Sequence, residues 1–599
     1  MKKYLYTVVW FVALVIIASA LLLYEDHLLW KLQEMNLFLD TSMFLKEQMV
    51  VPAGLLTWTG MFFTQFFYWP WFGVLLICAW WWLLMWLVKR TFRVPSLWTG
   101  LMLIPVAILL MTLVDQGYWI YFLKLQGHFF SATLGTTAVV ALLWAYRSLP
   151  SRRFQRTVFV FLVCALGYPL MGIYGLAASL LMAVWSWRLR EHAVADSVVA
   201  LLSAVAVPLF CYRYIFYQTN LANIYYAGLP LFYVTEEHHA YYIPYYLLAL
   251  FFVVLAWVPL KPASKPLKPV IAQTVVLAAV AFGVFHFWFK DENFHRELAM
   301  QHHIEELDWE GVLQEAAAQE DEPTRAVVMM KNLALSRLGR QSSEMYQYKN
   351  GSRRYEAPFG MRTMLAVGPL IYYQYGMLNY SVRLSTEMGV EFGWRAEHLK
   401  TLAKCAILNG EKAPARKYLG LLQHTLFFKD WADQNRSLIG DTTAIARHPE
   451  YGPVRLMMHY DNDLNADEGN VESFLMNQLA SSTYAGNPMF TEQTLLASLW
   501  TRNAKQFWYH FYDYVNQHPD DGIPIYYQEA AYLFGYLEER PDLDSFPVSS
   551  GVKESFQHFM ESASRYNDAD IEVARRGLYP FFGQTYFYEY YVMDHLPEY

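Results

Sequence analysis

The stretch YLYTVVWFVALVIIASALLLYEDH, residues 4–27, decides the fold, because a long apolar run ends abruptly in charged residues. A helix needs about 20 apolar residues to cross roughly 30 Å of hydrocarbon, and this run has that length. It is longer than the apolar core of a signal peptide, and Leu21-Leu22-Leu23 is not a small-residue cleavage site. We therefore expect an uncleaved membrane anchor.

The composition extends this prediction to half of the chain. Of the 599 residues, 55% are hydrophobic, 18% aromatic and only 17% charged, which excludes both a disordered chain and an ordinary soluble protein. Four cysteines exclude a disulfide-stapled secreted scaffold. We expect an all-α protein whose residues 1–289 form a polytopic bundle of about nine spans. The nine predicted spans are Tyr4–Leu23, Trp71–Val88, Leu97–Val114, His128–Tyr146, Val158–Gly172, Ile173–Trp187, Val198–Tyr217, Tyr245–Leu260 and Val270–Phe289.

The distribution of charge predicts the orientation of the bundle. Residues 1–289 carry 18 Lys and Arg against 10 Asp and Glu, whereas residues 290–599 carry 28 against 43. Fourteen of those 18 basic residues lie in alternate short loops, and basic loops stay on the cytoplasmic side. The pattern predicts a bacterial-type inner-membrane protein with a cytoplasmic N-terminus. An odd number of spans places residues 290–599 in the periplasm.

Residues 290–599 contain amphipathic helical segments and few strand signals. Small residues at the predicted contacts and a turn about every 12 to 15 residues resemble tetratricopeptide (TPR) repeats, so we expect an α-solenoid-like domain. The predicted helix pairs are Ile304–Ala317 with Pro323–Gly339, Ala396–Asn409 with Ala413–Leu422, Lys505–Gln517 with Ile525–Leu537, and Ser555–Tyr566 with Asp568–Tyr579. Such a domain can bind periplasmic or envelope proteins, or can simply cap the membrane domain.

A large outer loop, residues 24–70, follows the first span and is expected to lie along the membrane surface. It opens with Glu25-Asp26 at the outer end of the span. Adjacent carboxylates there are costly to desolvate, and one can raise the pKa of the other. In this respect the chain resembles the GT-C class of membrane glycosyltransferases, whose polytopic domain has an acidic pair in this place. As a whole, it is also similar to an uncharacterised family of bacterial envelope membrane proteins.

The GT-C resemblance implies a transferase that moves a sugar from a polyprenyl-phosphate-type lipid to an exported acceptor. It implies that Glu25, Asp26 and, by position, Asp40 act as base or orient a divalent metal ion. Lys124 in the second outer loop and Arg213 near the outer end of the seventh span are the cations available for the donor phosphate. A carboxylate base and a cation beside the leaving phosphate are chemically suited to this reaction.

Each of these residues also has a simpler interpretation. Glu25 and Asp26 can be a solvated pair at the interface, and Arg213 can extend toward water from its helix end. Glu236-Glu237-His238-His239 has metal-binding atoms, but consecutive residues cannot all face one ion, so a solvated loop is favoured. No nucleotide-binding, zinc-protease or serine-hydrolase motif is visible, and the acidic outer half disfavours nucleic acid.

Two functions therefore remain open. The first is the GT-C-like transferase, and the alternative is a non-enzymatic membrane scaffold whose helical repeats bind envelope proteins. A transporter ranks third, because no pair of corresponding broken helices is found. The transferase hypothesis predicts that Glu25, Asp26 and Arg213 converge on a cavity reachable from both lipid and the outer space.

Overall fold

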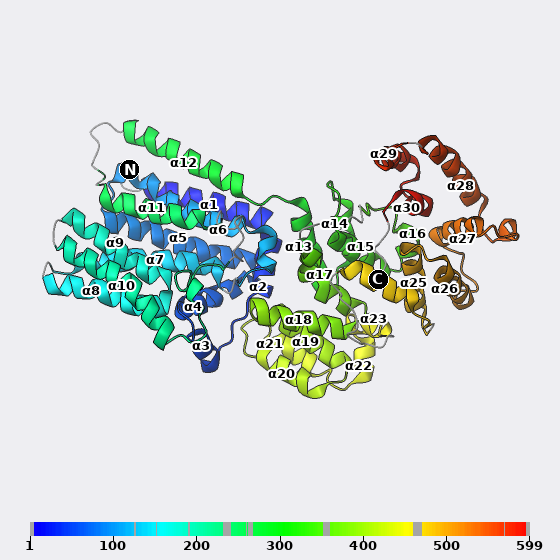
Figure 1. The fold of residues 1–599 in the computed structure, drawn as a ribbon, viewed down its shortest axis with the longest axis horizontal. Helices are drawn as coiled ribbons and strands as arrows, with labels where there is room; N and C mark the ends of the chain where they lie inside the picture. Colours follow the sequence, from blue (N-terminus) through cyan, green and yellow to red (C-terminus); the bar gives the residue numbers. More distant parts are fainter. Residues whose placement is uncertain are drawn as a thin grey trace. The chain divides into compact units, whose positions relative to one another are not determined.

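In the computed structural model of the protein, every regular element within the described residues is a helix (Figure 1). The described residues are 5–124, 127–150, 153–189, 192–231, 241–258, 260, 267–351, 360–458, 470–484, 486–567 and 569–594. The chain forms two compact units. Unit 1 contains Met1–Lys290 together with Gly389–Leu399 and Gly420–Asp433, and unit 2 contains the remaining ranges, Asp291–Met388, Lys400–Leu419 and Gln434–Tyr599. The sequence predicted a single domain boundary after residue 289. It did not predict that the later segments Gly389–Leu399 and Gly420–Asp433 belong to unit 1.

Unit 1 is built mainly from long apolar helices. Its apolar helices are α1 (Leu5–Tyr24), α5 (Pro70–Phe92), α6 (Leu103–Val114, preceded by the 3-10 helix η2, Ser96–Met102), α7 (His128–Ser148), α8 (Arg153–Met171), α9 (Ile173–Leu189), α10 (Ala193–Tyr214), α11 (Ile243–Trp257) and α12 (Leu267–Phe287). The nine predicted runs are thus all helical. Only six segments, however, are long and apolar enough to be candidate spans, namely α1, α5, η2 with α6, α7, α10 and α12.

The predicted number of spans was therefore too high by this criterion. The apolar parts of α8, α9 and α11 are Gln155–Met171, Ile173–Leu189 and Ile243–Trp257, which have 17, 17 and 15 residues. At 1.5 Å per residue they are roughly 23 to 26 Å long, short of a full hydrocarbon core. The first two are separated by Gly172, which adopts a left-handed φ of +60°. A side chain there would meet the carbonyl oxygen of Ala227, so a glycine is required.

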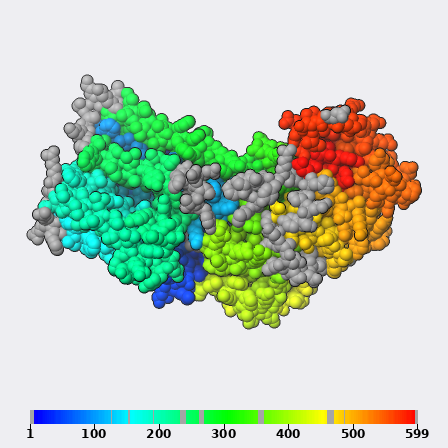
Figure 2. Space-filling model, in the orientation of Figure 1, coloured from blue at the N-terminus to red at the C-terminus, as the bar shows by residue number. Residues whose placement is uncertain are grey.

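The outer surface of unit 1 is apolar, as expected for helices that contact lipid. Only 6% of the apolar window of α12 is buried, and in Figure 2 this helix is the green band along the outside of the bundle. Phe282 and Phe285 on α12, and Leu201 and Leu202 on α10, are more than half exposed. A soluble protein rarely exposes so continuous an apolar surface. These helices identify the chain as a membrane protein.

Contacts at the helix ends fix the directions of four helices. The indole of Trp10 in α1 donates to the carbonyl of Thr99 in η2 at 3.0 Å, and Lys89, near the end of α5, lies 5.8 Å from the Trp10 ring. At the other end, the indole of Trp288 donates to the Glu25 carboxylate at 2.5 Å. Helices α1 and α12 therefore run in the same direction, and α5 runs against them. The chain leaves α12 at the end of the bundle where the first loop begins.

The first loop does not simply lie on the membrane surface. It forms α2 (Asp26–Glu34), α3 (Ser42–Gln48), α4 (Gly54–Thr64) and the 3-10 helix η1 (Gln65–Tyr68), and α4 packs against α7 and α8. A side chain at Gly60 would overlap the backbone of Gly127, so the two backbones are in direct contact. The amide of Asn36 donates to the carbonyl of Met61 at 3.0 Å inside the loop. The amphipathic pattern therefore predicted helices but not their insertion among other helices.

Two later segments of unit 1 pack on this loop through buried charges and aromatic rings. Lys31 of α2, only 6% exposed, donates to the carboxylate of Glu397 at 2.5 Å. Arg395 is 3.4 Å from the same carboxylate. The ring of Phe427 stacks on Tyr68 with centroids 4.8 Å apart and planes within 4°. None of this is visible in the sequence, because the partners are more than 350 residues apart.

The helices after residue 290 follow the predicted pairs in position. They are α13 (Glu292–Glu305), α14 (Trp309–Ala317), α15 (Arg325–Arg337), α16 (Gln341–Glu344), α17 (Gly360–Gln374), α18 (Leu378–Phe392), α19 (Ala396–Leu408), α20 (Lys412–Leu422), α21 (Lys429–Arg436), α22 (Thr442–Arg447), α23 (Tyr451–Leu456), α24 (Val471–Ser481), α25 (Pro488–Trp500), α26 (Ala504–Gln517), α27 (Ile525–Leu537), α28 (Ser550–Ala563), α29 (Ile571–Phe582) and α30 (Tyr586–Val592). The predicted helix Ile304–Ala317 is wrong, since α13 ends at Glu305 and Asp308 caps α14 by accepting from the Gly311 amide. A regular solenoid repeat remains a hypothesis.

We predict that Glu397→Gln lowers the free energy of unfolding of the purified protein by about 3 kcal/mol at neutral pH, because Lys31 is left buried without its counter-charge. Burial favours the neutral acid, but the charges of Lys31 and Arg395 outweigh this and lower the pKa of Glu397 to about 2. The stabilisation is therefore complete above pH 4.5 and is lost as the pH falls toward 2.

Thermal unfolding in detergent at several pH values measures this effect. The double variant Lys31→Met/Glu397→Gln should recover part of the loss, because it removes both charges. Equal stability of wild type and Glu397→Gln at pH 7 would contradict the assigned role.

Candidate functional site

A polar cavity of about 330 Å³ opens in unit 1 where the first loop meets the start of α7. Its walls come from three separate parts of the chain, which are the first loop, the start of α7 with the residue Lys124 before it, and the connection after α10. Its lining residues are Val51, Pro52, Thr57, Lys124, His128, Ser131, Gln218, Thr219, Asn220, Asn223, Tyr226, Ala227, Gly228, Leu229, Pro230 and Leu231. Lys124 is exposed, and it is the one lysine or arginine among these lining residues.

A second cavity of about 450 Å³ adjoins the first, and Tyr226 and Leu229 line both. It lies among α7, α9, α11 and the 3-10 helix η4 (Leu221–Asn223) and is lined mainly by apolar and aromatic groups. Six of its lining residues are tyrosines, namely Tyr174, Tyr225, Tyr226, Tyr242, Tyr245 and Tyr246. The two cavities are a polar compartment with a cation and an adjacent, largely apolar compartment, and Tyr226 and Leu229 belong to the walls of both.

The connection after α10 is irregular but is held to the helices by hydrogen bonds. The hydroxyl of Tyr168 donates to the carbonyl of Ile224 at 2.8 Å, and the hydroxyl of Tyr242 donates to the carbonyl of Pro230 at 2.7 Å. The backbone amide of Ile173 donates to the carbonyl of Ala227 at 2.9 Å. Backbone carbonyls of this segment have no partner in a helix, and these hydrogen bonds supply one. The same bonds hold the segment in place as part of the cavity walls.

Three hydroxyl groups in the wall of the apolar cavity, those of Thr136, Tyr174 and Tyr245, have no hydrogen-bond partner within the described residues. All three hydroxyl oxygens are buried. Tyr174 is 6% exposed and Thr136 is 2% exposed. Buried hydroxyls normally find a partner, so their presence in a cavity wall points to a ligand that carries polar groups as well as apolar surface.

A partly buried carboxyl group, that of Asp115, lies near a residue of the polar cavity. The side-chain amide of Gln116 donates to the Asp115 carboxylate at 3.3 Å and to the Thr112 carbonyl at 3.1 Å. A ring nitrogen of His128 is 3.4 Å from the same carbonyl. Burial raises the pKa of Asp115 to about 7 against the smaller opposing effect of its hydrogen bonds. Asp115 can therefore gain and lose a proton near neutral pH, as a general base requires.

Glu25 and Asp26, the predicted base pair, lie apart from both cavities. Glu25 is 2% exposed, and its carboxylate accepts the Trp288 indole, which ties the ends of α1 and α12 together. Asp26 is half exposed and accepts the backbone amide of His27 at 2.8 Å. Asp40 is mostly exposed and accepts a bond from His424 at 2.9 Å. None of the three lines either cavity.

The two predicted cations differ. Lys124 lines the polar cavity, whereas Arg213, in the last turn of α10, is exposed and lines neither cavity. The predicted convergence of Glu25, Asp26 and Arg213 is thus not seen at these two cavities. In the described ranges no group of three or more His, Cys, Asp or Glu is placed to hold a metal ion. The residues Glu236 to His239 lie outside the described residues.

Sequence reasoning overlooked Asp115 and His128. Asp115 directly follows the predicted span Leu97–Val114, and His128 begins the predicted span His128–Tyr146, but neither residue was predicted to belong to a site. The available signal was a carboxylate directly after an apolar run and a histidine directly before the next one. Both are helix-end positions that usually face water, and only the fold reveals that His128 is buried and Asp115 partly buried.

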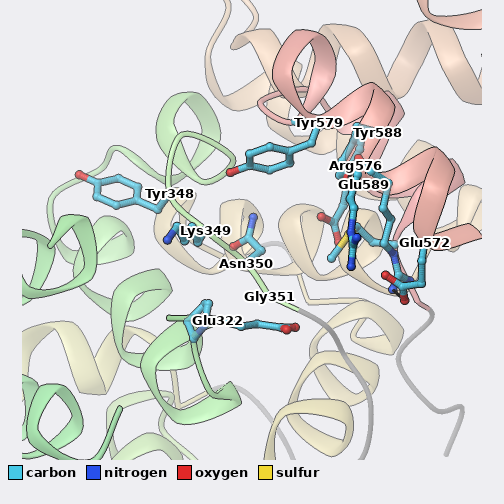
Figure 3. Close-up of a pocket in the computed structure, with 14 residues that line it drawn as sticks. Glu322, Tyr348, Lys349, Asn350, Gly351, Glu572, Arg576, Tyr579, Tyr588 and Glu589 are labelled. Carbon is cyan, nitrogen blue, oxygen red and sulfur yellow. Dashed lines mark hydrogen bonds and ion pairs between the residues drawn. The ribbon is translucent and has the colours of Figure 1, made fainter. Parts of the chain in front are cut away.

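A third cavity, of about 630 Å³, lies in unit 2 between the loop after α16 and the C-terminal helices. Figure 3 shows the Tyr579 side chain pointing across the cavity toward the segment that carries Tyr348. Arg576 and Glu589 lie on the same side as Tyr579, with the C-terminal helices. Its lining mixes tyrosines, carboxylates and cations. Such a groove suits a polar partner such as a peptide or a carbohydrate.

The fold defines a multi-helix membrane protein with a large helical domain after its last apolar helix. A family model described as a family of unknown function, DUF6057, matches residues 2–594, and the chain belongs to that family. No curated protein and no solved structure matches the chain.

We predict that Asp115→Asn changes how stability depends on pH. Because the folded protein raises the pKa of Asp115, folding takes up a proton between about pH 4 and 7, and wild-type stability falls across this interval. The variant should lack this fall and should be the more stable protein at pH 8. Thermal unfolding between pH 4 and 8 tests it, with Asp26→Asn as the matched, half-exposed control. Parallel pH profiles of wild type and Asp115→Asn would show that the acid is not buried.

Proposed function

We propose that unit 1 binds a lipid-linked phosphate and is a GT-C-like transferase of its sugar or glycan. The observation that carries this proposal is the pair of adjacent cavities, one polar with Lys124 and the other apolar and rich in tyrosine. A polyprenyl-phosphate sugar has the same two parts, a charged head and a long apolar chain. The unpaired hydroxyls of Tyr174 and Thr136 offer hydrogen bonds to the polar groups of such a ligand.

Asp115 is the base in this proposal, in place of Glu25 and Asp26. Asp115 lines neither cavity itself, but its partner Gln116 donates to the Thr112 carbonyl, and that carbonyl is 3.4 Å from a ring nitrogen of His128 in the wall of the polar cavity. Asp115 takes the proton of the acceptor hydroxyl. The hydroxyl oxygen then forms a bond to the anomeric carbon of the sugar as the bond from that carbon to the phosphate oxygen breaks. Lys124 neutralises the departing phosphate.

The proposal includes a topology. We infer that the basic end of the bundle faces the cytoplasm of a bacterial-type cell and that the chain after α12 enters the periplasm. Contacts within unit 1 support this, because α1 and α12 end together, at the end opposite to Lys89. If α8, α9 and α11 also cross, tilted or in locally thin membrane, the bundle has an odd number of crossings.

Lys124→Gln should weaken binding of a polyprenyl phosphate about tenfold, because one charged contact to the phosphate is lost. Native mass spectrometry of the full-length protein in detergent, with undecaprenyl phosphate added, measures retention. Arg213→Gln is the matched control, since it removes an exposed outer cation that lines neither cavity. Equal losses in both variants would indicate surface charge attraction, and no loss in Lys124→Gln would refute the proposed site.

The orientation predicts which positions react with a membrane-impermeant maleimide in whole cells whose outer membrane is permeabilised. Ser550→Cys, exposed in unit 2, should react, whereas Ser148→Cys, exposed at the basic end of α7, should react only after the inner membrane is opened. The four native cysteines are buried and provide a low background. The reverse labelling pattern would reject the topology and, with it, a periplasmic reaction.

A second candidate is the non-enzymatic scaffold that binds envelope proteins. The favouring observations are the open groove of unit 2 and the placement of Glu25, Asp26 and Arg213 away from the two cavities of unit 1. The two candidates separate in cells. A transferase loses its surface glycan in Asp115→Asn at unchanged protein level, whereas a scaffold is unaffected by this change and loses function when Arg576 in the groove is replaced by alanine.

A further inference from the structure

Three arginines gather at one end of the unit 1 bundle, away from the cavities. Arg93 follows α5, Arg147 is in the last turn of α7, and Arg188 is in the last turn of α9. Arg147 and Arg188 lie over the same indole ring, that of Trp185, at 4.9 and 4.6 Å from its centroid. His128 of the polar cavity begins α7, 19 residues or roughly 28 Å from Arg147 along the helix. This end of the bundle is therefore a separate site.

The positive charge of this cluster is not balanced within the described residues. No ion pair there involves any of the three arginines, and the charge of Arg93 acts repulsively on both of the others. Arg188 donates to the carbonyls of Leu255 and Ala256, at 3.4 and 3.3 Å, which are neutral acceptors at the end of α11. Like charges held together in a partly apolar setting repel one another strongly, so an anion stabilises the arrangement.

Trp185 adds a donor that has no acceptor. Its side chain is only 3% exposed, and its indole N–H makes no hydrogen bond within the described part of the structure. A buried indole N–H normally has a partner. Two guanidinium groups around one unpaired indole donor form a set that suits the oxygens of a phosphate, which accepts several charge-assisted hydrogen bonds.

The surroundings identify the source of the phosphate as a lipid. Trp144, Trp187 and Trp257, near the ends of α7, α9 and α11, are 41%, 49% and 59% exposed. Tryptophan is enriched where a membrane protein meets the lipid headgroups, and these rings belong to the same helix ends as the cluster. A phosphate held there has room for acyl chains along the exposed apolar faces of the helices.

We propose that Arg147, Arg188 and the Trp185 indole form a binding site for the phosphodiester headgroup of an anionic phospholipid such as phosphatidylglycerol. The site lies in the leaflet at the basic end of the bundle and does not depend on the transferase proposal. Bound lipid closes the space between the ends of α7, α9 and α11 and offsets the repulsion among the arginines.

The test uses purified full-length protein in detergent, freed of lipid and then mixed with phosphatidylglycerol, phosphatidylcholine or inorganic phosphate. Phosphatidylglycerol should be retained in native mass spectra and should raise the melting temperature more than phosphatidylcholine does. Arg147→Gln/Arg188→Gln should reduce this retention about tenfold or more, and Trp185→Phe, which keeps the ring and removes the N–H, should reduce it severalfold. Lys124→Gln and Arg213→Gln should leave it unchanged.

Arg147→Lys/Arg188→Lys keeps both charges and serves if the glutamine variant fails to fold, and it too should weaken retention because lysine lacks the paired donors of arginine. Unchanged phosphatidylglycerol retention in Arg147→Lys/Arg188→Lys and Trp185→Phe would overturn the site. Equal protection by inorganic phosphate alone would overturn the lipid assignment, because the ligand would then be a free anion. Equal retention of phosphatidylcholine would remove the role of the headgroup charge.

Discussion

Inside hydrocarbon, a backbone amide or carbonyl has to find its partner within the protein, and unit 1 is organised by this constraint. Helices satisfy it automatically, which is why the apolar runs are all helical. The segment after α10 is not helical and depends on partners from its neighbours. Tyr168 and Tyr242 donate to carbonyls of this segment, and the Ile173 amide donates to another, so the irregular backbone stays in place. Residues of that segment line both cavities, so these hydrogen bonds help to fix the cavity walls.

The wall on the other side of the polar cavity belongs to the first loop. Val51, Pro52 and Thr57 lie in that wall, and the same loop carries Lys31, which pairs with Glu397 from a distant part of the chain. The ion pair is buried and reinforced by Arg395, so this part of unit 1 depends on charges that are costly to leave unpaired. A change at Glu397 therefore has consequences for the shape of the cavity, although Glu397 is not part of it.

Cations of unit 1 occupy two different settings. Lys124 is exposed at a polar cavity beside an aromatic one, a setting for an anion that arrives and leaves. The arginines around Trp185 are partly buried and near one another at helix ends, a setting for an anion that stays. The two proposals assign these roles to a substrate phosphate and to a structural lipid. The Glu25 carboxylate also has a structural role, because it accepts a hydrogen bond from the Trp288 indole.

The sequence by itself determined the helical class, the position of each apolar helix and the approximate helix pairs after residue 290, because these follow from hydropathy, periodicity and stop signals along one segment at a time. Gly339 and Gly410, for example, follow the ends of α15 and α19 in left-handed conformations, as their positions in the pattern indicated. The sequence also identified Lys124. Only the tertiary structure decided that Glu25 accepts a hydrogen bond from an indole, that His128 is buried and Asp115 partly buried, and that two segments beyond residue 388 belong to unit 1. The physical reason is that desolvation and pairing depend on neighbours brought from far along the chain, and a one-dimensional pattern carries no record of them.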